Sequence, residues 1–317
     1  FAYGNLYAES CTADRAVAKI SGGKVTATSG SVDLDAENSS TSKSLAAAGG
    51  TDLLLVGATT SESKAYVGKS GRRQVAEVFI ADGAVVKAKE DVDLYAYNIG
   101  LAQAIIQKGG SYSIAKIAVS ALPTVSYYST YAGVKDGCRV AADRDIRIRA
   151  QDYARARSEA MDTSMGVGVN VATTYGDNAV YTDTKVEIGA AKLFSTRDVL
   201  IQAESSAYMY ALTYASVGSI FYGSGTMQAR NYLARTVTAD ILGGADIESD
   251  FGTLTVRATG GAADEITTYA RCDSTGFVAI GDARAYIDVS TVVKANVARG
   301  AKLKNTFGYV KIYTDAS

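Results

Sequence analysis

The segment Ala84–Ala96 reads AVVKAKEDVDLYA: a short alternating stretch, a polar turn around Glu90 and Asp91, and a second alternating stretch. Five further segments match it: GKVTATSGSVDLDA (23–36), GCRVAADRDIRIRA (137–150), GAAKLFSTRDVLIQA (189–203), GADIESDFGTLTVRA (244–258) and GAKLKNTFGYVKIYT (300–314). The six copies end at Ala36, Ala96, Ala150, Ala203, Ala258 and Thr314, at intervals of 60, 54, 53, 55 and 56 residues. A recurring period of this length indicates stacked structural repeats.

The last stretch of each copy carries apolar residues at two fixed positions. The first position holds Val32, Val92, Ile146, Val199, Leu254 and Val310, and the second holds Leu34, Leu94, Ile148, Ile201, Val256 and Ile312. Apolar residues that alternate with polar ones are typical of half-buried strands, and the same apolar positions at a fixed period are what a solenoid requires. We therefore predict an all-β fold, a parallel β-helix or β-solenoid of about six repeats that forms one continuous segment over residues 1–317.

The stretches between the copies also alternate. In the segment 207–215, Tyr208, Tyr210 and Tyr214 fall on one face and small residues fall on the other, which predicts a narrow core. Gly-rich runs at 165–169, 217–219 and 276–281 are predicted to be bends. Because a solenoid coil commonly takes about 18 to 28 residues, each period is expected to hold two or three coils, and the chain to form a rod of roughly 55 to 85 Å. The alternative is that a period forms fewer, flattened coils.

The composition removes several classes of function. The chain of 317 residues has no histidine, so His-based general acid/base chemistry and His-containing zinc sites are excluded. Its 32 basic and 33 acidic residues give a net charge of −1, which does not favour nucleic acid. No apolar stretch approaches the ~18 residues of a membrane-spanning helix. We expect no enzymatic activity, no cofactor, no nucleic-acid partner and no membrane span.

Two pairs of aspartates are candidates for calcium ligands or paired catalytic carboxylates. The alternation places both members of each pair outward, and another repeat carries arginines there, so the interpretation adopted is a solvated strand face and no metal site. The aspartate pairs are Asp33/Asp35 and Asp91/Asp93, and the arginines are Arg147 and Arg149.

A surface contact ladder of tyrosines is the candidate binding feature, because tyrosine presents a large rigid surface with a polar tip. Its members are Tyr208, Tyr210, Tyr214 and Tyr222, together with Tyr127, Tyr128 and Tyr131. The ladder binds sugar rings or a partner surface in one interpretation; in the other it covers neighbouring coils or a sister filament. Cys11, Cys138 and Cys272 are far apart in the sequence, which indicates free buried thiols, with interchain disulfides as the alternative.

The block G-A-x-V-x-A-x-x-D-V-x-L-x-A, with alternating Ala and Gly tracts between its copies, resembles the repeat-built passenger regions of large bacterial surface adhesins, the filamentous-haemagglutinin-like and leukotoxin-like secreted proteins. That resemblance implies export, a right-handed parallel β-helix, and a role in attachment or in an extracellular fibre. Cell-surface glycans or other filaments are the partners it implies.

The function expected from the sequence is therefore structural or adhesive, at the cell surface or outside the cell. The alternative is a carbohydrate-active β-helix enzyme, a polysaccharide lyase or hydrolase that uses Lys and Tyr for base-catalysed chemistry. Because residues 1–20 read as the tail of a preceding repeat and no capping segment is visible, the chain is expected to associate head to tail with itself or to continue into flanking repeats.

Overall fold

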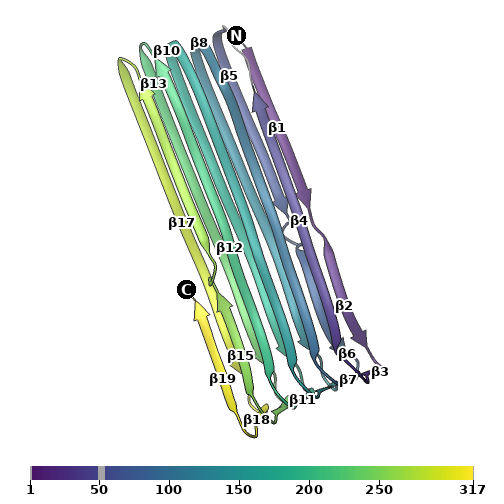
Figure 1. Ribbon diagram of the computed structural model, residues 1–317. Coiled ribbons are helices and arrows are strands. Elements are labelled where there is room, and N and C mark those ends of the chain that lie inside the picture. Colours follow the sequence, from purple (N-terminus) through teal and green to yellow (C-terminus); the bar gives the residue numbers. More distant parts are fainter. Residues whose placement is uncertain (1, 49–53, 317) are drawn as a thin grey trace.

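The computed structural model describes residues 2–48 and 54–316, which form a single stack of parallel β-coils (Figure 1). The described residues contain no helix, and so none that is long and apolar enough to cross a membrane. All long strand pairings are parallel, between equivalent segments of successive coils. The predicted all-β solenoid is therefore confirmed.

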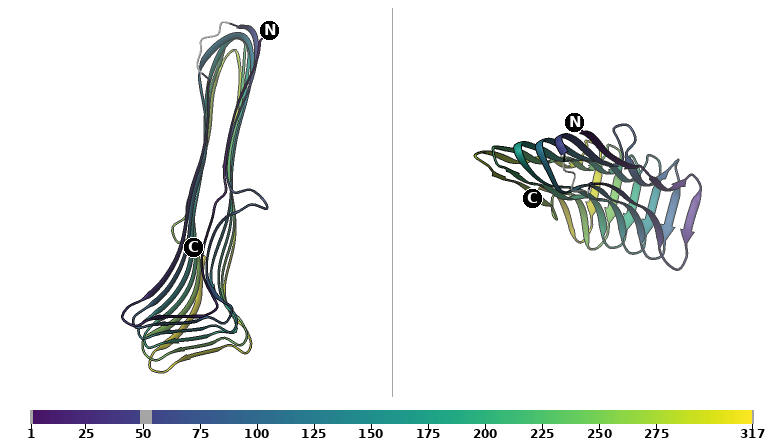
Figure 2. Two further views of the ribbon diagram at one scale, coloured as in Figure 1. Left: turned by 90° about the vertical axis from the view of Figure 1, so that its right-hand side faces the viewer. Right: turned by 90° about the horizontal axis from the view of Figure 1, so that it is seen from above.

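Each coil follows one path, seen end-on in the left view of Figure 2. A strand leaves a wide base, runs along a narrow arm to its tip, reverses, and returns to the base, where a short strand closes the coil. In one coil this path is β8 (Val92–Val134) followed by β9 (Arg139–Ala142), and the next coil begins with β10 (Ile146–Ile188). The arm thus has two layers, which we call the outgoing layer and the return layer.

The two sheets divide the coil between them. The short base strands form a six-stranded sheet of β3 (Lys24–Ala27), β7 (Val85–Ala88), β9, β11 (Lys192–Ser195), β14 (Asp246–Ser249) and β18 (Lys302–Asn305). The outgoing layer contains β4 (Val32–Ala48), the first halves of β8 and β10, β12 (Val199–Ser219), β15 (Thr253–Gly260), β16 (Glu265–Thr275) and β19 (Tyr309–Ala316). The return layer contains β1 (Ala2–Thr12), β2 (Arg15–Ser21), β5 (Leu54–Val67), β6 (Gln74–Ala81), the second halves of β8 and β10, β13 (Tyr222–Ile241) and β17 (Val278–Val297).

The register of the stack follows the repeats of the sequence. Val92 pairs with Val32 on one side and with Ile146 on the other, and Ile146 pairs in turn with Val199. The ends of the motif pair in the same way, from Ala36 through to Thr314. Every copy of the motif therefore occupies the same place in its coil.

The number of coils per period is lower than the two or three expected, and the alternative of fewer, flattened coils is correct. Equivalent residues one period apart are direct strand partners, so each period makes one long flattened coil and not two or three compact ones. Six coils then span only five strand spacings, about 24 Å, and the stack is far shorter than the predicted rod. The length of each period goes into the arm instead, because β8 and β10 alternate without a break and run perpendicular to the stack axis.

The longer first period comes from one loop. Thr12 pairs with Val67, but Arg15 pairs with Val75, so the chain has five more residues between Val67 and Val75 than between Thr12 and Arg15. The loop 68–73 holds this extra length and leaves both pairings in register. The loop holds Gly68 at φ +72°, where a Cβ would also lie 2.7 Å from the carbonyl oxygen of Tyr127. The extra length of this period thus lies outside the motif.

The wide base encloses the main hydrophobic core. It is lined by the two apolar columns of the motif, by the inward residues of the short base strands, such as Val140 and Leu193, and by the returning strands, such as Ile188 and Ile241. In the four middle coils these side chains are at most 1% exposed, whereas Val32 of the first coil is 9% exposed and Val310 and Ile312 of the last coil are 42% and 46% exposed. Since burial of each such side chain contributes roughly 1.5–3 kcal/mol, the base core is a main source of stability.

A polar neck separates the base core from the arm. The outgoing strands contribute Asn38, Asn98, Asp152 and Ser205 to it, and the return strands contribute Gln74, Tyr128, Thr182 and Arg235. Asn98 donates to the carbonyl oxygen of Gln74 at 3.0 Å, and Ser205 donates to Asp152 Oδ1 at 2.7 Å. Buried polar groups keep their cost low through such bonds.

The arm beyond the neck has a thin interior. In β12 the inward residues Ala207, Met209 and Ala211 are fully buried, as the small inner face of this segment predicted. Small residues allow the two layers to approach closely. The pairing of β10 passes from β12 at Gly166 to β13 at Val169, so the chain reverses between these two residues, and the equivalent reversals fall at 220–221 and 276–277. The Gly-rich runs 165–169 and 276–281 thus contain the predicted bends, and the run 217–219 ends directly before one.

Replacing Ile201 with Ala tests the inward columns. Ile201 is fully buried, so its truncation should lower the free energy of unfolding by about 2–5 kcal/mol. The matched control Leu200→Ala removes a half-buried outward side chain from the same strand and should cost less than about 1.5 kcal/mol. Denaturant unfolding measures both, and equal losses would contradict the assignment of the two faces.

Replacing Asp152 with Asn tests the neck. Burial raises the pKa of Asp152 from 3.8 to about 6, although Thr184 and Ser205 donate to its carboxylate. The unfolded chain therefore loses this proton first as the pH rises, and stability falls between about pH 4 and pH 6 by roughly 3 kcal/mol in all. Asp152→Asn should raise the free energy of unfolding at pH 7.5 and reduce its fall between pH 4 and pH 7. The variant Asp143→Asn, at an exposed position, serves as the control. If the free energy of unfolding of Asp152→Asn still falls by the same amount between pH 4 and pH 7, another group causes the fall.

Candidate functional site

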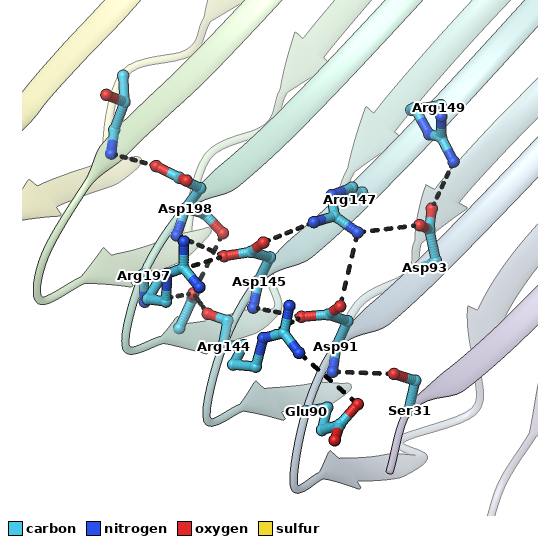
Figure 3. Close-up of polar contacts among 12 residues, drawn as sticks. Ser31, Glu90, Asp91, Asp93, Arg144, Asp145, Arg147, Arg149, Arg197 and Asp198 are labelled. Atoms are coloured by element: carbon cyan, nitrogen blue, oxygen red, sulfur yellow. Dashed lines mark hydrogen bonds and ion pairs between the residues drawn. The ribbon is translucent and has the colours of Figure 1, made fainter.

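One corner of the base carries a ladder of aspartates that join successive coils (Figure 3). Asp91 Oδ1 accepts the backbone N–H of Asp145 at 3.1 Å, Asp145 Oδ1 accepts that of Asp198 at 3.2 Å, and Asp198 Oδ1 accepts that of Thr253 at 2.6 Å. Ser31 holds the same place one coil earlier and accepts the N–H of Asp91 at 3.2 Å. A side chain of each coil thus holds the backbone of the next coil at this corner.

Arginines balance the charge of this ladder. Arg147 lies between Asp91, Asp93 and Asp145, and Arg149 donates to Asp93 Oδ1 at 3.0 Å. The aspartates are 15%, 18% and 7% exposed in their side chains, so these ion pairs are partly shielded from solvent and stronger than those of a free surface. The corner is held together by alternating charge across coils.

The aspartate pairs named as metal candidates lie at this corner. Asp33 pairs with Asp93 in the strand register, and Asp93 pairs with Arg147. Repulsion from Asp93 and burial raise the pKa of Asp33, with burial the larger cause. Within residues 2–48 and 54–316, no three acidic or cysteine side chains gather closely enough to hold a metal ion. Asp91 and Asp93 instead form ion pairs with Arg147 and Arg149 of the following coil.

A face rich in tyrosine and arginine covers the outgoing layer of the arm. We call it the Tyr–Arg face and define it as Tyr95, Tyr97, Arg149, Tyr153, Arg155, Arg157, Tyr208, Tyr210, Tyr214, Tyr269 and Arg271. Guanidinium groups lie over the rings, with Arg155 at 4.6 Å from the Tyr153 centroid, and Arg157 at 5.6 Å from that of Tyr210. Tyrosine and arginine are the residues that most often dominate binding at protein interfaces.

The predicted tyrosine ladder is divided between two faces. Tyr208, Tyr210 and Tyr214 follow one another outward along β12, and the hydroxyl of Tyr214 donates to Asp273 at 3.1 Å. Tyr222 begins β13, beyond the tip, and lies in the return layer. The structure therefore brings three of the four residues together and places Tyr222 apart from them.

The second group of tyrosines is also divided. Tyr127 and Tyr131 point outward, and Tyr127 stacks on Tyr181 of the next coil with ring centroids 4.6 Å apart. Tyr128 points inward and is fully buried in the neck, because adjacent strand residues face opposite sides. Its place in an outward ladder was wrong. Gly100 makes room for it, since a Cβ there would lie 2.6 Å from the Tyr128 hydroxyl.

The three cysteines are free in the described chain. Cys138 is buried in the base core, Cys272 is half-buried, and Cys11 is exposed on β1. Burial raises the pKa of the Cys272 thiol, which lowers its reactivity at neutral pH. The expectation of buried thiols thus holds fully for Cys138 alone.

The tip of the arm carries an apolar surface that the sequence interpretation did not identify. We call it the tip ridge: Ile114, Val167, Ile220, Phe221 and Phe277. They are about half exposed or more, and Phe277 is 90% exposed. The segment 165–169 contained the signal, because its apolar residues alternate with glycine, but alternation alone does not say which face lies inside. Exposed apolar patches of this kind mark contact with other molecules.

Replacing Asp145 tests the aspartate ladder. Asp145→Ala leaves the N–H of Asp198 without its acceptor and should cost about 1–3 kcal/mol of stability. Asp145→Asn keeps a carbonyl oxygen at the same place and should cost less. Hydrogen exchange at the Asp198 amide, read alongside denaturant unfolding, should accelerate in the alanine variant. Equal exchange and equal stability in the two variants would show that this bond does not hold the corner.

Known proteins give no further guide to these surfaces. Comparison of the chain with known protein families, with curated proteins and with solved structures finds no match. Three features of the stack therefore bear on function: the aspartate ladder at its corner, the Tyr–Arg face along its arm, and the tip ridge at the end of the arm.

Proposed function

We propose that this chain is a structural or adhesive component of an extracellular surface protein or filament, and not an enzyme. The observation that carries the proposal is the contrast between the inside and the outside of the stack. The two inward columns of the motif keep their apolar character from Val32 and Leu34 to Val310 and Ile312, whereas the outward position between them holds Asp33, Asp93, Arg147, Leu200, Thr255 and Lys311 in turn. The fold is thus maintained while the surface varies, as a scaffold for contacts requires.

The character of the exposed surfaces also supports contact with large partners. The Tyr–Arg face is broad and follows several coils, and the tip ridge projects apolar side chains at the edge of the stack. Large rigid surfaces of this kind suit recognition of another surface, such as cell-surface glycans or a second filament. Export and a location at the cell surface follow from this role as part of the proposal.

Extension of the stack is the second part of the proposal. In the last described coil, the inward side chains are not covered by a further coil. Ile287, Val289, Val310 and Ile312 are each 42–54% exposed. Edge strands with free backbone groups pair readily with another strand. We propose that further repeats of the same chain, or a second copy placed head to tail, cover these columns and continue the register.

Charging the inward edge tests this extension. The double variant Ile287→Lys/Val289→Lys places two charges in columns that stacking would bury, so it should abolish end-to-end association of the purified chain. The matched control Ser290→Lys/Val292→Lys adds the same charges to the outer face of the same strand and should leave association intact. Light scattering and electron microscopy measure the association, and circular dichroism checks that each variant is folded.

Two results would overturn the proposal. A parent chain that stays monomeric at high concentration, or that associates equally in both double variants, would contradict stacking through the inward columns. Turnover of an acidic polysaccharide that is lost on replacing a single Lys or Tyr would replace the scaffold with the alternative, a carbohydrate-active enzyme.

A further inference from the structure

The outer surface of the short base strands differs from the other faces of the stack. The strands β3, β7, β9 and β11 lie side by side in register at the base (Figure 1). Each strand directs one cation outward, and these are Lys24, Lys87, Arg139 and Lys192, all exposed. The face therefore carries one positive charge per coil over four successive coils, which we call the basic base.

The cations of the basic base have no acidic partner among the described residues. Elsewhere arginines such as Arg147 and Arg149 lie against carboxylates. On the base sheet of the described chain the acidic side chains begin at β14, where Asp246 is the strand neighbour of Lys192 but forms no ion pair with it, and Glu248 pairs with Lys304 of β18. The basic base thus leaves its charge available to an external anion, although the net charge of the chain is −1.

A shallow groove accompanies these charges. Its volume is about 410 Å³, and its apolar lining includes Val85, Ala141 and Phe194, which is 40% exposed. The cations stand beside these side chains along the same strands. The groove therefore offers an apolar floor with a row of cations, which is the combination that a ring with one apolar side and an attached anionic group would fit.

We propose that the basic base binds a linear acidic polysaccharide, carrying carboxylate or sulfate groups, laid along the stack axis. Lys24, Arg139 and Lys192 share one register position across the coils, where β7 carries Val85, and Lys87 lies two residues further along β7. Arg139 and Lys192 are therefore about one strand spacing apart, ~4.8 Å, close to the length of a pyranose unit, and Lys24 and Lys87 continue the positive charge towards the earlier coils. Phe194 and Val85 pack against the sugar rings. This inference rests on the proposed adhesive function and names its ligand class.

Single-stranded nucleic acid fits the groove less well. Proteins that bind it combine a basic groove with several aromatic side chains on which successive bases stack. The basic base offers Phe194 as its only aromatic ring within the described residues that line the groove. Its aliphatic floor favours sugar rings over stacked bases.

Binding to defined polymers tests the inference. Polygalacturonate supplies carboxylates, dextran sulfate supplies sulfates, neutral dextran supplies neither, and single-stranded DNA supplies phosphates; calorimetry measures each with the purified chain. The variant Lys87→Gln/Arg139→Gln/Lys192→Gln should weaken binding of at least one acidic polysaccharide about tenfold or more. The matched control Lys43→Gln/Lys294→Gln/Lys311→Gln removes the same charge from exposed positions on other faces and should bind as the parent does.

The variant Phe194→Ser distinguishes the contribution of the apolar groove from that of the positive charges. It should weaken polysaccharide binding at unchanged net charge, and circular dichroism checks that it is folded. The inference is overturned if the parent binds neither acidic polymer, if both triple variants lose affinity equally, or if DNA binds more tightly than either polysaccharide. If the parent chain stacks but binds neither acidic polymer, the polysaccharide inference is wrong and the proposed scaffold function still stands. If the parent chain shortens polygalacturonate, the chain is an enzyme and the scaffold proposal itself is wrong.

Discussion

The structure depends on one constraint: in a parallel stack with fixed register, every side chain lies next to the equivalent side chain of the coil before and the coil after. Inside the base this favours apolar columns, because Val92 on Val32 and Ile146 on Val92 bury surface without any polar cost. At the corner the same rule would place aspartate on aspartate. There the N–H of the following coil and the arginines between the coils make repetition of Asp91, Asp145 and Asp198 favourable.

The same constraint explains how polar residues occur inside the stack. In the neck, Asn98 follows Asn38, and Asp152 and Ser205 follow in the same column. Each finds partners from the opposite layer or from the next coil, so a hydrogen-bonded section joins the base core to the arm. The arm interior also holds buried polar side chains, such as Asn178, which donates to Asn231 Oδ1 at 2.8 Å. Arg235 belongs to the same section and donates to both carboxylate oxygens of Asp264, at 2.7 and 2.9 Å.

The sequence predicted most of the architecture because its signal is local. The apolar pairs such as Val32/Leu34 and Val92/Leu94 recur at nearly constant intervals, and their register needed only a comparison of the copies. The length of the coil could not be predicted in this way, because alternation continues unchanged through the neck and past the tip of the arm. The tip ridge was missed for a related reason: in the segment 165–169 the apolar residues face outward and the glycines inward. The basic base draws its four cations from four separate repeats, and only the register places them together.

The size of the coil has a consequence for how the chain reaches its folded state. Every strand pairing joins residues 53 to 61 positions apart, so forming the first pair closes a long loop before any contact stabilises it. Nucleation should therefore be slow, as in other proteins dominated by distant contacts. Once one coil exists, each new coil adds to a finished template and no longer has to find its partner. Such a chain folds in order from a nucleus outward, and a segment that has not yet met the growing edge remains extended.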